Sequence, residues 1–120
     1  MNVIENSKSN IKRIVDNLLS KIYNDDYVII QRDKNKEFMM YYRLTKEDIK
    51  KILCCISIGT YFSEEFDSDT LKYGPETVVI FIVERTLVNI NGEESSVRIY
   101  IKIKNKEDKV PVISIHEAEK

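Results

Sequence analysis

The C-terminal end of the chain alternates between isoleucine and polar side chains, and this pattern constrains the fold more than any other stretch. From Val97 to Glu117 the sequence reads VRIYIKIKNKEDKVPVISIHE. Successive side chains of a β-strand point to opposite faces, so a period of two predicts two half-buried strands joined by a loop. The apolar face carries Ile99, Ile101, Ile103, Ile113 and Ile115. The polar face carries Arg98, Tyr100, Lys102, Lys104, Ser114 and His116.

The register of this hairpin decides which polar groups meet. If Lys104 and Val110 close a five-residue loop as opposite neighbours, Arg98 lies opposite His116. Tyr100 is then diagonal to His116, at roughly 7–8 Å. The only histidine of the chain is therefore expected beside a tyrosine, an arginine and a lysine.

Length and composition limit the classes of protein to consider. With 120 residues and 42% hydrophobic content, residues 1–120 are expected to form a single domain. The formal net charge of −1 gives no global attraction to nucleic acid or membrane, so a polyanion would need a local basic patch. No apolar run approaches the ~18 residues that span a bilayer, and no apolar signal core opens the chain, so the cytoplasm is the expected compartment.

The two cysteines are adjacent, and this limits the disulfide and metal chemistry to expect. Cys54 and Cys55 cannot close an ordinary disulfide loop. The sequence also lacks a Cys/His spacing typical of a metal site, so neither a metal nor a cofactor is expected. Because neither thiol has an obvious base or cationic partner, both are interpreted as small packing residues.

Three stretches upstream of the hairpin have helical features. Apolar residues recur at helical spacing over positions 11–22, with Ser9 available as the N-cap. A second helix is expected over Asn35–Tyr42, where aromatic and methionine side chains supply bulk. The third follows Thr45, which can cap it and form a capping box with Asp48 three residues later.

The remaining segments are assigned from apolar runs and turn residues. Tyr27–Gln31 is expected to be a short edge strand, and Val78–Val83 a central strand covered on both faces. The polar passage Gly59–Pro75 predicts a loop with solvated carboxylates. A two-residue turn at Asn91-Gly92 would place Val83 opposite Tyr100.

This order of elements predicts an α+β fold. Helices, a weak strand and then three strands in an antiparallel meander are typical of a small antiparallel sheet with helices packed on one face. The helices would cover the isoleucine face, and the polar face would stay at least partly open. Any chemistry is therefore expected on the polar face.

The polar face combines residues that suit RNA chemistry. Positions 98–109 hold five basic and two acidic residues, so a locally basic surface lies on a slightly acidic protein. Phosphate is a plausible partner for such a surface. Metal-free RNA cleavage requires a base for the 2′-OH, an acid for the departing 5′ oxygen and cations for the charged phosphorane. The other interpretation is that the lysines only keep the face soluble and that the histidine has no catalytic role.

Five segments, in this order, resemble the MqsR-type toxins of bacterial toxin–antitoxin modules, within the wider RelE/ParE-like group of small ribonucleases. They are IIQRDKNKEFMMYYRLTKEDIKKIL, GTYF, KYGPETVVIFIV, VRIYIKIK and VPVISIHEAEK. The resemblance covers residues 28–119. It implies a RelE/MqsR-like sheet with helices on one side and metal-independent cleavage of messenger RNA by 2′-OH attack. It also implies a cognate antitoxin protein, with a helix-turn-helix domain, that sequesters the toxin.

The resemblance also assigns roles to residues. Tyr100 and Lys102 match the strand motif Tyr-Ile/Leu-Lys, and His116 matches the basic position of the last strand. His116 is therefore expected to be the general base or acid and Tyr100 its partner in proton transfer or positioning, with Lys102 stabilising phosphate charge. The expected RNA and phosphate contacts are Arg98, Lys104, Arg85 and Lys72.

Two positions depart from the family pattern. The lysine expected after the aromatic pair 61–62 is Ser63, and a glutamine expected on the next strand is the apolar Ile80. Lys72 or Arg85 could supply the missing polar group. The competing hypothesis is a non-enzymatic binding or regulatory module that keeps a toxin-like fold and holds a protein partner on its open face. A third interpretation is that this face packs a dimer.

Overall fold

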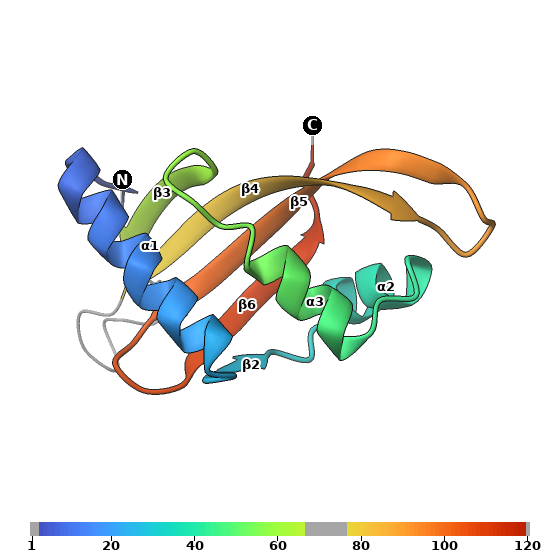
Figure 1. The fold of residues 1–120 in the computed structure, drawn as a ribbon, viewed down its shortest axis with the longest axis horizontal. Coiled ribbons are helices and arrows are strands. Elements are labelled where there is room, and N and C mark those ends of the chain that lie inside the picture. Colours follow the sequence, from blue (N-terminus) through green and yellow to red (C-terminus); the bar gives the residue numbers. More distant parts are fainter. Residues whose placement is uncertain (1–2, 67–76, 120) are drawn as a thin grey trace.

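The computed structural model describes residues 3–66 and 77–119, and these form one six-stranded sheet with three helices (Figure 1). The strand order is β1-β3-β4-β5-β6-β2. The strands are β1 (Val3–Ile4), β2 (Tyr27–Ile29), β3 (Tyr61–Phe66), β4 (Thr77–Val88), β5 (Glu94–Asn105) and β6 (Val110–Glu117). The helices are α1 (Lys8–Tyr23), α2 (Asp33–Tyr41) and α3 (Lys46–Leu53). Neighbouring strands are antiparallel except β2 and β6, so the predicted α+β class with a mainly antiparallel sheet is confirmed.

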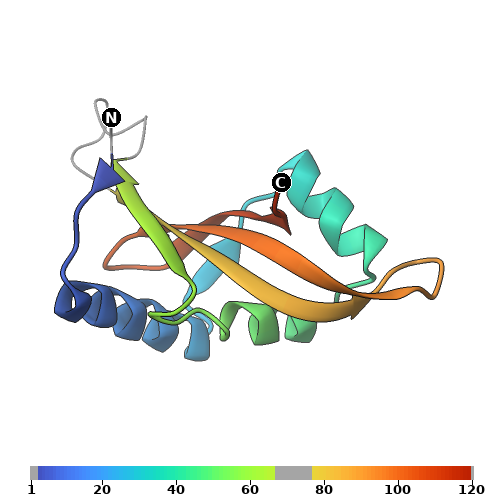
Figure 2. The same cartoon turned by 90° about the horizontal axis from the view of Figure 1, so that it is seen from above.

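Helices α1 and α3 cover one face of the sheet (Figure 2). Their apolar stripes bury Ile14, Val15, Leu18, Ile22, Ile49, Ile52 and Leu53. The sheet contributes fully buried residues of β4, β5 and β6 to the same core, among them Phe81, Ile99, Ile101, Ile103 and Ile115. The isoleucine face predicted from the alternation is therefore the core face for β5 and for Ile115, whereas the prediction is wrong for Ile113, which is half-buried at a register shift of β6.

Local capping signals fix the starts of these two helices. Thr45 and Asp48 form the predicted capping box: the Asp48 amide donates to Thr45 Oγ1 at 3.1 Å, and the Thr45 amide donates to Asp48 Oδ2 at 2.9 Å. The predicted Ser9 cap of α1 is wrong, because Ser7 accepts from the Asn10 amide instead. The helix begins before its apolar stripe does.

Helix α2 lies apart from the other two, beside the outer edge of β6 (Figure 2). Its Phe38 and Tyr42 still reach the core. The prediction that all helices pack on one face therefore holds for α1 and α3 only. This arrangement places the start of α2 next to the C-terminal half of β6.

Segment 61–66, expected as part of a loop, is strand β3 and pairs with β4. The acidic residue Glu64 is buried rather than solvated, because its carboxylate accepts hydrogen bonds from Asn6 Nδ2 at 2.9 Å and Thr77 Oγ1 at 2.6 Å. Strand β1 was also missed, while β2 is the edge strand predicted. Residues 67–75 of the expected loop lie outside the described residues.

The turn between β4 and β5 is longer than predicted. It spans residues 89–93, where Asn89 Oδ1 accepts from the amides of Asn91 and Glu93 and Gly92 adopts a positive φ of 78°. An odd number of turn residues shifts the pairing by one, so Val83 lies opposite Ile99 and not opposite Tyr100. As a result, even-numbered residues of β4 share a face with the polar residues of β5.

Candidate functional site

The open face of the sheet, which α1 and α3 do not cover, carries three cross-strand rows of side chains. The strand register defines them as Ile80, Lys102 and Ser114; Ile82, Tyr100 and His116; and Glu84 and Arg98. Polar residues of the sequence motif are thus brought together with two apolar residues of β4. The face is a mixed surface rather than a purely basic one.

Tyr100 and His116 lie directly opposite one another, and their rings stack. The ring centroids are 5.4 Å apart and the planes differ by 20°. The predicted diagonal arrangement, with Arg98 opposite His116, is wrong because β6 contains a bulge at Ile113 and its loop from β5 is shorter than assumed. The correction brings the two candidate catalytic rings closer than the sequence indicated.

A groove of about 500 Å³ runs over this part of the face. The predicted residues Arg98, Tyr100, Lys102 and His116 all line it. It is also lined by Arg32, Lys34 and Phe62, which the sequence did not single out as site residues. Arg32 and Lys34 lie in a charged run about 80 positions before β6, and nothing in that run indicates which strand it faces.

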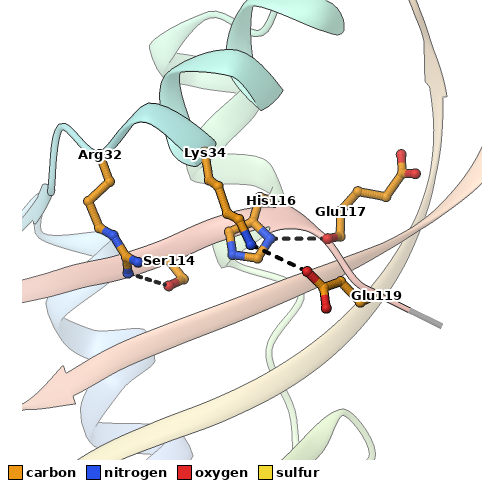
Figure 3. Close-up of polar contacts among 6 residues, drawn as sticks. All are labelled: Arg32, Lys34, Ser114, His116, Glu117 and Glu119. Carbon is orange, nitrogen blue, oxygen red and sulfur yellow. Dashed lines mark hydrogen bonds and ion pairs between the residues drawn. The ribbon is translucent and has the colours of Figure 1, made fainter. Parts of the chain in front are cut away.

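The imidazole of His116 is oriented by the backbone next to it (Figure 3). Its Nδ1 lies 3.0 Å from the carbonyl oxygen of Glu117. A carbonyl oxygen only accepts hydrogen bonds, so this contact holds the proton of the neutral ring on Nδ1. Nε2 then carries the free lone pair, and His116 is set up to act as a base through that atom.

The phenol of Tyr100 is set up as a donor. Burial raises the pKa of Tyr100, the negative charge of Glu65 raises it further, and the nearby Arg32 opposes both effects. The ordinary tyrosine pKa of about 10 already keeps a phenol protonated at neutral pH, and the upward shift preserves that state while making the phenol a weaker acid. The stacked pair therefore joins a base, His116, to a proton donor.

The start of α2 brings two cationic side chains to the groove (Figure 3). Arg32 Nη1 donates to Ser114 Oγ at 3.1 Å, and Lys34 Nζ forms an exposed ion pair with Glu119 Oε1 at 3.3 Å. Across the described part of the chain, neither Arg98 nor Lys102 forms an ion pair. The groove thus presents cations that an anionic ligand can reach.

Of the three other residues predicted to bind phosphate, the two that the structure describes do not line the groove. Arg85 lies towards the helices, where its Nη1 donates to Cys55 Sγ at 3.0 Å. Lys104 shares the open face but lies one row beyond Lys102. Lys72 lies outside the described residues.

The contact with Arg85 also corrects the interpretation of the thiols. Cys55 does have a cationic neighbour, so the expectation that neither cysteine has one was wrong. For Cys54, burial raises the pKa of the thiol and the charge of Lys50 opposes this effect. Each of the two thiols therefore has a basic side chain nearby, Arg85 for Cys55 and Lys50 for Cys54.

The two departures from the family pattern meet on β3 and β4. Ser63 and Ile80 are directly opposite one another, and both are buried. The Ser63 hydroxyl donates to Glu65 at 3.2 Å. Because serine and isoleucine are uncharged, neither position adds a cation to the groove. Phe62, next to Ser63, is 67% exposed and presents an aromatic ring to the groove.

No cluster of three or more histidine, cysteine, aspartate or glutamate side chains suited to a metal occurs within residues 3–66 and 77–119. The described helices include none with the length and apolar character needed to cross a membrane. Comparisons of the chain with models of protein families, with curated proteins and with solved structures found no match. The likeness to MqsR-type toxins therefore stays a prediction from the sequence.

Proposed function

We propose that this protein is a metal-independent endoribonuclease that cleaves single-stranded RNA, acting as the toxin of a toxin–antitoxin module. The observation that carries this proposal is the stacked Tyr100–His116 pair in a groove lined by arginine and lysine. The pair supplies an oriented base and a protonated donor on adjacent strands. These are the two proton-transfer roles that RNA cleavage requires.

Each step of the reaction then has a candidate group. His116 Nε2 takes the proton of a ribose 2′-OH, and the 2′ oxygen attacks the adjacent phosphorus. The bond from phosphorus to the 5′ oxygen breaks, and the Tyr100 phenol gives its proton to that leaving oxygen. Arg98 and Lys102 stabilise the charge of the pentacoordinate phosphorane. The products are a 2′,3′-cyclic phosphate and a 5′-hydroxyl, and water returns the two residues to their starting protonation states.

Phe62 favours a single-stranded substrate. Its ring is exposed in the groove beside Ile82 and Tyr100. Aromatic side chains bind unpaired bases by stacking, which a base inside a duplex cannot do. A nucleotide next to the scissile phosphate can therefore place its base on Phe62 while its phosphate lies against the cations.

A toxin of this kind acts on messenger RNA in the cytoplasm and is held inactive by its cognate antitoxin. We assign the antitoxin a helix-turn-helix domain on the strength of the sequence resemblance alone. The structure bears on this partner only through the open face, whose groove would have to be blocked or distorted for inhibition.

A second candidate function is a non-enzymatic module that uses the same face to hold a protein. Ser63 and Ile80 favour it, because two positions that carry polar groups in the toxin pattern are here neutral and buried. Failure to cleave RNA or arrest growth, together with tight capture of a protein partner, would select this alternative.

Expression of active-site variants tests the enzymatic proposal. His116→Ala and Tyr100→Phe should relieve growth arrest and slow RNA cleavage on the order of 10²-fold, because general acid and base groups contribute at least that much. Tyr23→Phe is the matched control, since Tyr23 ends α1 and is 61% exposed. If His116→Ala and Tyr100→Phe are as toxic as the wild-type protein, the assignment is wrong.

A further inference from the structure

The side chains of β6 change direction at Ile113. Val110 and Val112 are fully buried in the core, whereas Ser114 and His116 line the groove on the open face. In an uninterrupted strand these four residues would all point to one face, because they are two positions apart. The bulge at Ile113 inserts one extra residue and reverses the alternation. Without it, the pattern that buries Val110 and Val112 would turn His116 towards the core.

At the same bulge, two successive carbonyl groups of β6 point to its outer edge. The Val112 carbonyl accepts from the Ile30 amide at 3.0 Å. The Ile113 carbonyl accepts from Asn35 Nδ2 at 2.9 Å. In a regular strand, consecutive carbonyls point to opposite edges, so once Ile30, just after β2, binds the Val112 carbonyl, the Ile113 carbonyl at the same edge requires another partner. Asn35 is that partner.

The side chain of Asn35 continues the hydrogen-bond ladder where β2 ends. Its Oδ1 accepts from the Ile115 amide at 2.9 Å, and its Nδ2 also donates to the Ile30 carbonyl at 2.9 Å. The residue is completely buried, 0% exposed. One amide group therefore binds the bulge residue Ile113 and Ile115 beyond it, and ties both to Ile30 at the end of the neighbouring strand.

We infer that Asn35 is a positioning residue for His116: its buried amide fixes the bulge of β6 and thereby holds the imidazole against Tyr100. The two cap residues of α2 add hydrogen bonds to β6 on either side of His116. Arg32 binds Ser114 at 3.1 Å, and the Tyr42 hydroxyl donates to Glu117 Oε1 at 2.6 Å. The kinetic consequence of this role rests on the proposed function, but its structural consequence does not.

Asn35→Asp tests the inference with little change of size. The carboxylate can still accept from the Ile115 amide, but it loses both donated hydrogen bonds and places an oxygen against the carbonyls of Ile30 and Ile113. In the wild-type protein, nuclear Overhauser effects should connect the rings of Tyr100 and His116, and in Asn35→Asp they should be lost. Cleavage should slow on the order of 10²-fold, as expected for a displaced catalytic group. Affinity for a non-cleavable 2′-O-methyl RNA should stay unchanged, because the groove cations remain.

Two controls separate positioning from general destabilisation. Asn17→Asp makes the same chemical change at an exposed site of α1 and should alter neither ring contact nor cleavage. Leu18→Val weakens the core away from the site and should keep the ring contact at temperatures where the protein is folded. If Asn35→Asp keeps the ring contact and cleaves RNA at the wild-type rate, the inference is overturned.

The inference remains testable when cleavage or folding fails. If the wild-type protein cleaves no RNA, the proposed function is refuted, and the ring contact alone decides the role of Asn35. If Asn35→Asp does not fold, hydrogen exchange of the wild-type protein gives the answer. The Ile115 amide should be as strongly protected as the amides paired between β5 and β6. Exchange at the rate of a solvent-exposed amide would overturn the inference.

Discussion

Removal of one positive charge from the groove should weaken RNA binding in a way that salt reveals. Arg98 lies on β5 in the row next to Tyr100 and lines the groove with Arg32 and Lys102. Cations that contact phosphate release counterions, so the logarithm of the affinity falls linearly with the logarithm of the salt concentration. Arg98→Gln removes the charge and keeps a polar side chain. We therefore expect the slope of this line to become shallower.

The size of the change follows from the number of groove cations. Lys34 is ion-paired with Glu119, which leaves three groove cations without an ion pair among the described residues. If Arg32, Arg98 and Lys102 each contact one phosphate of a single strand, the slope is about −2, at about −0.7 per contact. Between about 50 and 200 mM salt the affinity of the wild-type protein then falls about 20-fold. With Arg98→Gln the slope should be about −1.4 and the fall about 7-fold.

Fluorescence anisotropy with a labelled 2′-O-methyl RNA measures these slopes without cleavage. The matched control is Arg13→Gln, which makes the same change in net charge at an exposed position of α1, on the other side of the sheet. This control should leave the slope unchanged. Equal slopes for Arg98→Gln and Arg13→Gln would refute the assignment of phosphate binding to the groove.

Three further predictions concern Arg85, the cap of α3 and the ionisation of the buried tyrosines. Arg85→Gln should leave RNA affinity unchanged in the same titration, because Arg85 contacts the helix side of the sheet; a loss comparable with Arg98→Gln would contradict the structure. Thr45→Ala should lower the free energy of unfolding in urea by about 1 kcal/mol through loss of the cap, whereas Ser9→Ala should have almost no effect. Burial raises the pKa of both Tyr42 and Tyr100, because it disfavours the charged phenolate in the folded protein. The free energy of unfolding should therefore keep its full value below the ordinary tyrosine pKa of about 10 and fall as the pH rises through the pKa values of the folded state. Phenolate absorbance should show at least three late-titrating groups, because burial also raises the pKa of Tyr27; a single transition for all tyrosines would contradict this.

The sequence predicts those parts of the fold whose signals are local. The stripe of α1 and the Thr45–Asp48 capping box each lie within a few turns of one helix, so their spacing alone identifies them. The alternation in β5 likewise separates the core face from the open face correctly. Strand β3 escapes this reasoning because Glu64 becomes buried only through partners on distant segments, Asn6 and Thr77.

The register between β5 and β6 at the site cannot be predicted from local sequence patterns. The pairing of Tyr100 with His116 depends on a bulge that Asn35 supports from about 80 positions away, and no pattern within β6 reveals that partner. The same holds for Arg32, whose charged run is brought to Ser114 by the placement of α2. The sequence therefore identified which strand face carries the polar groups, but not which of them touch or which helix completes the groove.

The chemistry of the RNA ends tests most directly whether the Tyr100–His116 pair cleaves RNA through the ribose 2′-OH, as we propose. Purified protein should cut a single-stranded RNA in the presence of EDTA and leave 2′,3′-cyclic phosphate and 5′-hydroxyl ends, and His116→Ala should do so on the order of 10²-fold more slowly. Cleavage that disappears with EDTA, or that leaves 3′-hydroxyl and 5′-phosphate ends, would contradict the mechanism. Equal cleavage by the wild-type protein and His116→Ala would contradict the assignment of the base.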